Sequence, residues 1–322
     1  MRKGFLQDYG VLIAFVVLFA INVVTRGGSF LQPQNLLNLV SQNADIGLIA
    51  VGMTFVIIAG GIDLSVGSLL ALCGAIGLLS LNKTQSMPVA LAAAVGVGAF
   101  TGFLNGLVIS FGRVAPFIVT LAGLAGFRSL AMVAGSGGEI RSQVSAFQNI
   151  GFGGLPIPGT ADPTGKPLSL YWVAVAFLVV ALLAGVLLNR TRFGRHVIAV
   201  GSNEQAARYS AIDANRVKVA TYVIVGTLAG LAAFFVTARQ NSVGTGSTGL
   251  YYELDAIAAV VIGGTSLRGG RGRIWGTVVG VLLLTLIANM MTAYRIDPNW
   301  QGLVRGMVIL IAVLMQRGSK SE

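Results

Sequence analysis

The chain has 322 residues, of which 55% are hydrophobic and only 10% charged, and its mean hydropathy is +0.81. Soluble domains carry about 25% charged residues, so the composition excludes an ordinary soluble domain. The apolar runs are long and contiguous, which excludes an outer-membrane barrel, because barrel strands alternate polar and apolar residues. The sequence therefore predicts an all-α polytopic membrane protein.

The apolar segments predict about ten transmembrane helices, some of them short or broken. They lie near residues 9–25, 44–60, 65–81, 88–111, 115–134, 170–188, 217–238, 254–264, 274–293 and 302–316. The eighth segment is short, since a full crossing takes about 20 residues. The first segment follows a basic start but shows no convincing cleavage site, so we expect an uncleaved first helix.

The net charge of +11 is explained by topology. When the N-terminus is placed inside and the segments alternate, the inner loops receive most of the 22 Lys and Arg, as the positive-inside rule requires. This predicts a multi-pass protein with both termini in the cytoplasm, an external loop at 135–169 and a cytoplasmic loop at 189–216. The basic charge then faces lipid headgroups, and we expect no nucleic-acid partner.

A charged turn interrupts the apolar stretch from residue 46 to residue 81. It contains Gly60, Gly61, Asp63, Ser65 and Ser68. An acid inside a membrane segment is costly, so it needs a partner, a water-filled cavity or a function. The glycines loosen the helix there, and the pattern is typical of a transport path rather than a simple anchor.

A second turn shares the same Gly-Gly-x-x-Leu frame. It contains Gly263, Gly264, Thr265 and Ser266, and it also follows an apolar run and precedes a glycine-rich segment. Transporters often carry internal repeats with broken helices in matching places. A match this short also arises by chance in a glycine-rich chain, so duplication and coincidence both stay open.

The cytoplasmic loop predicts a short capped helix over residues 204–209. Ser202 or Asn203 can cap it, and Glu204 lies near its positive end. We expect an exposed apolar tip at Ile212, which suits docking into a groove of a partner. From the residues alone, a connector lying on the membrane surface is favoured. The chain has no Walker A pattern, and its single histidine, His196, has no ligand partners nearby, so we expect neither a nucleotide site nor a metal site.

Three blocks in order resemble ribose-type permeases, the membrane subunits of bacterial ABC monosaccharide importers. They are Gly60-Gly61-Ile62-Asp63-Leu64-Ser65-Val66-Gly67-Ser68, the loop from Gly201 to Ile212, and the stretch from Glu253 to Leu267. The resemblance covers nearly the whole chain. It implies a single permease domain over residues 1–322 in the bacterial inner membrane, which translocates a ribose-like pentose, a hexose or a polyol and performs no covalent chemistry. The family usually has glycine at the position of Ala211.

The resemblance also implies partners and site residues. Cytoplasmic ABC ATPase subunits would bind ATP and Mg, so this chain would hold no cofactor, and a periplasmic or tethered sugar-binding protein would deliver the substrate. A second copy or a sister permease would complete the membrane part. The loop resembles the coupling helix, whose docking face would comprise Asn203, Glu204, Ala206, Ala207, Ser210 and Ile212.

Asp63 has two possible roles at this stage. It lines the path and accepts sugar hydroxyls, or it caps the next helix together with Ser65. We favour the structural role, because a path for a neutral sugar needs no buried charge. The other function classes are an ABC permease for branched-chain amino acids, an ion-coupled secondary transporter and a membrane-embedded enzyme. A secondary transporter would need ion-coupling acids in several helices, and only Asp63 is clearly inside the membrane here. An enzyme would need a constellation of catalytic residues, and the sequence shows none.

Three further groups of charges have alternative interpretations. Glu253 and Asp255 open the eighth segment, where the helix dipole favours acids; docking of the binding protein is the alternative. Arg268, Arg271 and Arg273 contact lipid headgroups or the ATPase. Arg128 reaches toward the membrane surface or pairs with an acid inside the bundle.

Overall fold

The computed structural model describes residues 2–160, 165, 167–297, 300, 302–304, 306–307 and 310, with the side chains of residues 2–9 left aside. The α-helices are α1 (Arg2–Arg26), α2 (Pro33–Ser41), α3 (Ala44–Ile58), α4 (Val66–Thr84), α5 (Met87–Ser110), α6 (Pro116–Ala134), α7 (Gln148–Phe152), α8 (Trp172–Arg190), α9 (Arg192–Ser202), α10 (Glu204–Tyr209), α11 (Ala214–Gln240), α12 (Tyr252–Ile262) and α13 (Ile274–Ala293).

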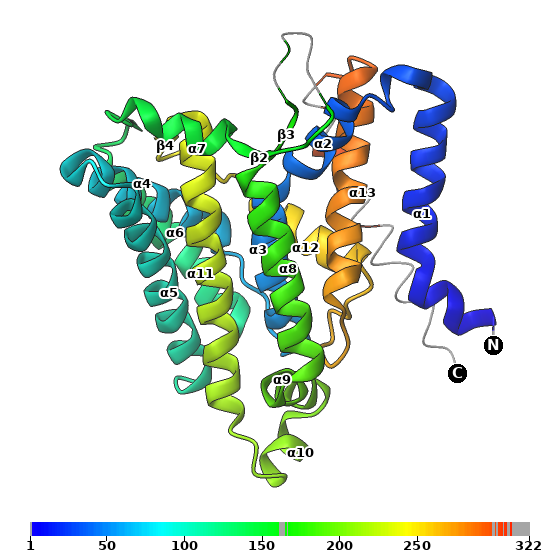
Figure 1. The fold of residues 1–322 in the computed structure, drawn as a ribbon. Helices are drawn as coiled ribbons and strands as arrows, with labels where there is room; N and C mark the ends of the chain where they lie inside the picture. Colours follow the sequence, from blue (N-terminus) through cyan, green and yellow to red (C-terminus); the bar gives the residue numbers. More distant parts are fainter. Residues whose placement is uncertain are drawn as a thin grey trace.

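Within the described residues, four strands of three residues form two small antiparallel pairs. They are β1 (Glu139–Arg141), β2 (Gly154–Pro156), β3 (Ser169–Tyr171) and β4 (Ser242–Gly244). β1 pairs with β4, and β2 pairs with β3. Both pairs lie at the end of the bundle opposite α9 and α10, together with α7 (Figure 1). The described part of the 135–169 loop is therefore a structured cover on one end of a helical protein.

The helical class is confirmed, whereas the count of about ten crossings is not. Within the described residues, seven helices are long and apolar enough to cross a membrane, or up to eight if α2 and α3, which meet at a bend of 42°, form one span. The segment predicted at 254–264 is α12, which has 11 residues. The segment predicted at 302–316 falls largely outside the described residues.

Helix α3 forms the centre of the bundle. Every residue from Ala44 to Ile58 is buried. A helix that is apolar all round is expected in such a place, because it has no face that favours water. It packs against α8, α11, α12 and α13, while α1 lies at the edge beside α13 (Figure 1). The outer helices expose large apolar side chains such as Phe100, Leu182 and Val24, as expected of surfaces that face lipid.

Helices α5 and α11 approach each other through glycine. In α5, Gly98, Gly102 and Gly106 are spaced by one turn, and α11 meets them with Gly226 and the backbone of Tyr222 and Val219. A Cβ added at Gly98 would overlap the carbonyl oxygen of Gly226. Small residues at such a spacing allow membrane helices to pack backbone against backbone, where dispersion contacts replace the missing hydrophobic drive.

Between β4 and α12 the chain is irregular. Its backbone carbonyls need donors, because lipid offers none. The guanidinium of Arg128 on α6 supplies them: it donates to the carbonyl oxygens of Thr248 (2.7 Å) and Thr245 (3.2 Å). Among the described residues, the hydrogen bonds of Arg128 go to these carbonyl groups and not to an acid, so Arg128 satisfies an irregular segment and does not simply reach the membrane surface. Glu253 and Asp255 lie in the first turn of α12, as predicted.

Replacing Gly98 by Leu should destabilise the bundle, because the new side chain has to displace the α11 backbone. We expect a loss of about 1–3 kcal/mol or more, seen as a lower melting temperature and a lower yield of monodisperse protein. Gly96→Leu is the matched control, since Gly96 lies in the same helix and a Cβ there meets nothing within 4 Å. Equal melting temperatures for the two variants would contradict this account of the α5–α11 contact.

Candidate functional site

The Asp63 turn begins with a glycine cap on α3. Gly60 has a φ of 84°, which is accessible to glycine and strained for other residues. The N–H of Gly60 donates to the carbonyl of Ile57 (3.0 Å), and that of Gly61 donates to the carbonyl of Val56 (2.9 Å). These two bonds define a Schellman motif, which ends the helix and turns the chain toward Asp63.

Asp63 is fully buried, and one of its oxygens caps the start of α4. Oδ1 accepts from the backbone N–H of Ser65 (2.8 Å) and from its hydroxyl (2.6 Å), and Ser65 is the residue before the first turn of α4. Asn105 donates to the Ser65 hydroxyl (3.2 Å), and Ser68 donates to the Ser65 carbonyl (2.8 Å). These are the contacts of the structural role.

The second oxygen of Asp63 is different. Oδ2 is buried and has no hydrogen-bond partner among the described residues. The rest of the turn is held from two helices, because Tyr222 of α11 (3.2 Å) and Thr120 of α6 (3.4 Å) both donate to the carbonyl of Ile62. In this conformation the buried carboxylate does not reach solvent, so the structural role stays the prediction and solute binding its alternative.

The second turn ends α12 in the same way. Gly264 has a φ of 88° and donates to the carbonyl of Val261 (2.9 Å), and Thr265 donates to that of Val260 (3.2 Å). The equivalent of Gly60 is therefore Gly264, one residue away from the pairing that the shared sequence frame predicts. Gly263 and Thr265 are buried, while Ser266 is half-buried and accepts from Gly269 (2.9 Å).

The two turns and the end of α9 meet at one carbonyl group. The N–H of Gly270 donates to the carbonyl of Ile58, the last residue of α3 (2.9 Å). Gly201 lies against the same carbonyl, and a Cβ there would overlap it. The backbone at the end of α9 is thus in direct contact with the base of the Asp63 turn and with the loop that follows the second turn.

The helix predicted over residues 204–209 is confirmed as α10, Glu204–Tyr209. Asn203 caps it by accepting from the N–H of Ala206 (3.0 Å). Ala211, which follows it, has a φ of 60°, a left-handed conformation that costs an alanine about 1 kcal/mol. This explains why glycine is the expected residue there, and the substitution by alanine leaves the turn in place.

The exposed tip of this loop is Tyr209 rather than Ile212. The Tyr209 side chain is 90% exposed, whereas Ile212 is half-buried and packs against the core. Ala207 is also buried, at 4% exposed, so its methyl group faces the protein. The other residues of the predicted docking face stay accessible: Asn203, Ala206 and Ser210 are exposed and Glu204 is half-buried. Sequence reasoning missed Tyr209, although a lone aromatic in a polar helix was the available signal.

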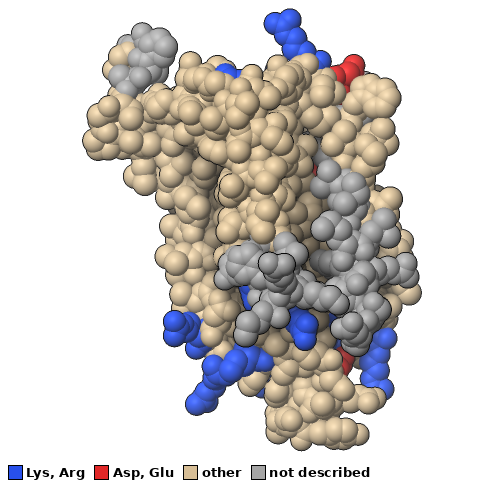
Figure 2. All heavy atoms as spheres, turned by 90° about the vertical axis from the view of Figure 1, so that its right-hand side faces the viewer, with Lys and Arg blue, Asp and Glu red and all other residues tan. Residues whose placement is uncertain are grey.

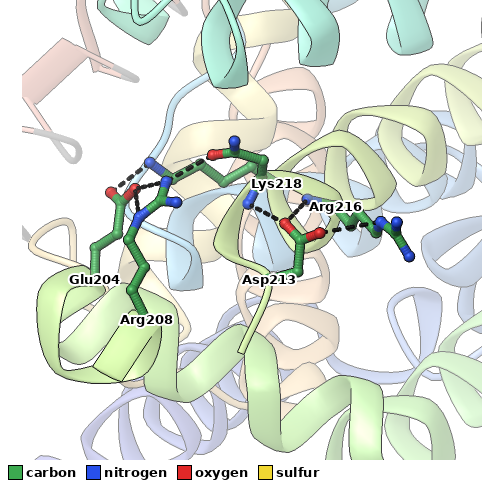
Figure 3. A network of polar contacts seen from close by, with 6 residues as sticks. Glu204, Arg208, Asp213, Arg216 and Lys218 are labelled. Atoms are coloured by element: carbon green, nitrogen blue, oxygen red, sulfur yellow. Dashed lines mark hydrogen bonds and ion pairs between the residues drawn. The ribbon is translucent and has the colours of Figure 1, made fainter. Parts of the chain in front are cut away.

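A polar network fixes α10 to α11 (Figure 3). The Glu204 carboxylate accepts from Lys218 (2.6 Å) and Arg208 (2.8 Å), and Arg208 also donates to Asn215 (2.6 Å). Burial raises the pKa of Glu204, but the hydrogen bonds and charges of Lys218 and Arg208 outweigh it, so the pKa lies below its usual value. Glu204 is therefore ionised at neutral pH, and its carboxylate is engaged within the chain.

Basic residues gather at the end of the molecule that carries α9 and α10. On the face in Figure 2, Lys and Arg side chains cluster toward that end below a broad stretch without charge. Arg268, Arg271 and Arg273 lie in the loop before α13, and their residues are exposed. This is the distribution that the predicted topology requires of the cytoplasmic side.

A buried ion pair at the opposite end was also missed by sequence reasoning. Asp45, at the start of α3, is 1% exposed and accepts from Arg239 of α11 (3.0 Å) and from the hydroxyl of Tyr252 on α12 (3.2 Å). It joins three helices, and a buried charge of this kind needs such partners. Asp45 stands at the edge of the apolar run, so nothing in the sequence separates it from an ordinary loop acid.

Comparisons with known proteins show the family of the chain. The family model described as the permease component of branched-chain amino acid transport systems matches residues 35–313. The ribose import permease protein of Escherichia coli is 40% identical over 314 residues, which cover 97% of this chain and 94% of that protein. The ribose import permease protein of Bacillus subtilis is 42% identical over 319 residues, 98% of this chain and 94% of that protein.

More distant relatives extend the set. The xylose transport system permease protein of Haemophilus influenzae is 32% identical over 367 residues, covering 98% of both chains. No solved structure matches the chain. The chain therefore belongs to the ribose-type ABC permeases, within the broader family of transport-system permease components.

Replacing Asp63 by Asn should keep much of the transport activity, because the amide oxygen can still accept from Ser65. Asp63→Leu has no acceptor and should lower the folded yield. The measurement is the yield of monodisperse permease together with solute uptake by proteoliposomes that contain the complete transporter. An Asp63→Asn protein that folds normally and transports nothing would show that the charge itself is required, and the structural role would then be insufficient.

Proposed function

We propose that this permease forms the membrane pathway of an ABC importer for a monosaccharide, with a ribose-like pentose as the first substrate to test. The observation that carries the proposal is the similarity over almost the entire chain to ribose import permease proteins. Similarity to xylose permeases supports the same class of neutral sugar. ATP hydrolysis in a partner subunit drives the cycle, and a binding protein delivers the sugar.

We also propose an orientation for the molecule. The α9–α10 end faces the cytoplasm, because the basic residues gather there (Figure 2). The end with the two strand pairs faces the periplasm. Helix α1 begins on the side of the bundle nearer α9 and ends toward the strand pairs (Figure 1), which supports a cytoplasmic N-terminus.

In this arrangement, α10 transmits motion from the ATPase. Its exposed residues and Tyr209 contact the ATPase groove, while Glu204 holds α10 to α11 and Gly201 holds the loop against Ile58. A displacement of α10 then moves the base of the Asp63 turn and the loop of the second turn together. The two turns are the parts of the pathway that this contact reaches directly.

The substrate is tested by ATP-driven uptake into proteoliposomes that contain the permease, its ATPase and its binding protein. We expect uptake of labelled D-ribose or D-xylose and no uptake of L-leucine. An ATPase variant unable to hydrolyse ATP is the control, and it should abolish uptake. ATP-driven uptake of L-leucine without uptake of either pentose would assign the chain to the amino-acid branch of the family and overturn the proposal.

Tyr209→Ser should weaken the association with the ATPase. An exposed aromatic side chain at the tip of a docking helix is the kind of residue that dominates an interface, and its removal should lower co-purification of the ATPase by about tenfold or more. The permease itself should fold normally, because Tyr209 is 90% exposed.

Tyr294→Ser is the control for this prediction. Tyr294 is also exposed, at 52%, but it follows α13 at the other end of the molecule. It should retain the ATPase at the wild-type level. Full retention of the ATPase by Tyr209→Ser, measured by co-purification at equal permease yield, would exclude Tyr209 from the contact.

A further inference from the structure

A cavity of about 590 Å³ opens at the α9–α10 end, beside α10. It lies between the loop that joins α5 to α6 and the junction of α10 with α11. Its polar lining consists of Ser110, Arg113, Glu204, Arg208, Asn215 and Lys218. Neither the Asp63 turn nor the second turn contributes a residue to it, so the cavity is separate from the pathway described above.

The cavity has an excess of positive charge. Arg113, Arg208 and Lys218 line it with one carboxylate, that of Glu204. Glu204 is engaged by Lys218 and Arg208, so it does not neutralise Arg113. Arg113 makes no hydrogen bond or ion pair within the described residues, and its φ of 54° is a costly backbone conformation for a residue other than glycine. The network thus leaves an unpaired guanidinium at the cavity.

A buried hydroxyl in the lining is also unsatisfied. Ser110 is 6% exposed, and its Oγ has no hydrogen-bond partner within the described residues. Leaving a buried polar group unpaired costs about 1–3 kcal/mol, and a bound water, ion or ligand group is one way in which such a cost is avoided. Ser110 belongs to the cavity lining, so a rotation of its side chain toward the cavity would let the hydroxyl donate to an anionic oxygen held by the neighbouring cations.

The surroundings indicate where the anion comes from. Phe111, Phe117 and Ile118, in the same α5–α6 region, are each more than half exposed. Their apolar side chains lie next to a basic cavity at the level where the basic loops of the protein meet the membrane surface. A ligand with an anionic head and an apolar tail satisfies both parts of this surface, whereas a free anion or an acidic side chain satisfies only the cavity.

We propose that the cavity lined by Ser110, Arg113 and Lys218 binds the phosphate group of an anionic phospholipid of the cytoplasmic leaflet, with its acyl chains against Phe111 and Phe117. Arg113 and Lys218 contact the phosphate oxygens, and Ser110 donates to one of them. The lipid then joins the α5–α6 loop to the α10–α11 junction, so its presence stiffens the segment that carries α10.

The test is native mass spectrometry and thermal unfolding of the full-length permease in detergent, with phosphatidylglycerol, phosphatidylcholine or inorganic phosphate added. We expect the permease to retain phosphatidylglycerol selectively. We also expect its melting temperature to rise with phosphatidylglycerol but not with phosphatidylcholine or inorganic phosphate. Arg113→Gln should weaken retention about fivefold, the effect of removing one basic residue beside anionic lipid. Arg195→Gln is the matched control, since Arg195 is exposed at the same end and does not line the cavity.

Ser110→Ala separates binding from folding. Because its hydroxyl has no partner in the described part of the protein, the variant should unfold at the wild-type temperature or higher without lipid, yet gain less from phosphatidylglycerol. Equal retention by Arg113→Gln and Arg195→Gln would overturn the proposal. So would equal retention of phosphatidylglycerol and phosphatidylcholine, or equal protection by inorganic phosphate, which would indicate a free-anion site.

Discussion

The carbonyl group of Ile58 is the point on which the arrangement of this protein depends. It belongs to the last residue of the central helix α3, it accepts a hydrogen bond from Gly270, and it lies against the backbone of Gly201. Three segments that are far apart in the sequence therefore share one polar group. The contacts at this carbonyl are made by backbone atoms, so a movement of the α9–α10 segment cannot be accommodated there by a change of side-chain rotamer. A packed backbone contact of this kind transmits displacement because protein interiors are as dense as organic crystals.

The same constraint governs the rest of the membrane part. Two turns and the irregular stretch before α12 expose backbone groups at places where lipid offers no hydrogen bonds. Each is satisfied by a different device: Schellman motifs at Gly60 and Gly264, the Asp63 carboxylate at Ser65, and the guanidinium of Arg128 at Thr245 and Thr248. Two charged residues inside the bundle, Asp63 and Arg128, are explained by this need before any role toward solute is considered. Asp63 Oδ2 is the exception, since it has no partner among the described residues.

Sequence reasoning predicted what periodicity and composition control. The apolar runs located the long helices, and the Asn203–Glu204 pair located α10 to the residue. It failed where tertiary packing decides. Ile212 looked like the free apolar tip because it ends a polar stretch, but the chain turns at Ala211 and returns its side chain to the core. The shared Gly-Gly-x-x-Leu frame pairs Gly60 with Gly263, whereas the structure makes Gly264 the equivalent of Gly60. The sequence does not show which of two adjacent glycines takes the positive φ.

The distribution of glycine then suggests which parts move together. Between α5 and α11, backbone meets backbone along several turns, so these helices form a rigid pair. Helix α10 is joined to the same α11 by Glu204 and Lys218, but through partly exposed charges, whose contribution in water is typically below 1 kcal/mol. The weaker joint is therefore the one between α10 and the bundle, while the backbone contact at Gly201 cannot be compressed. A force applied to α10 would strain the charged network first and reach the two turns through Ile58. This order follows from the weakness of the charged contact and from the density of the backbone contact.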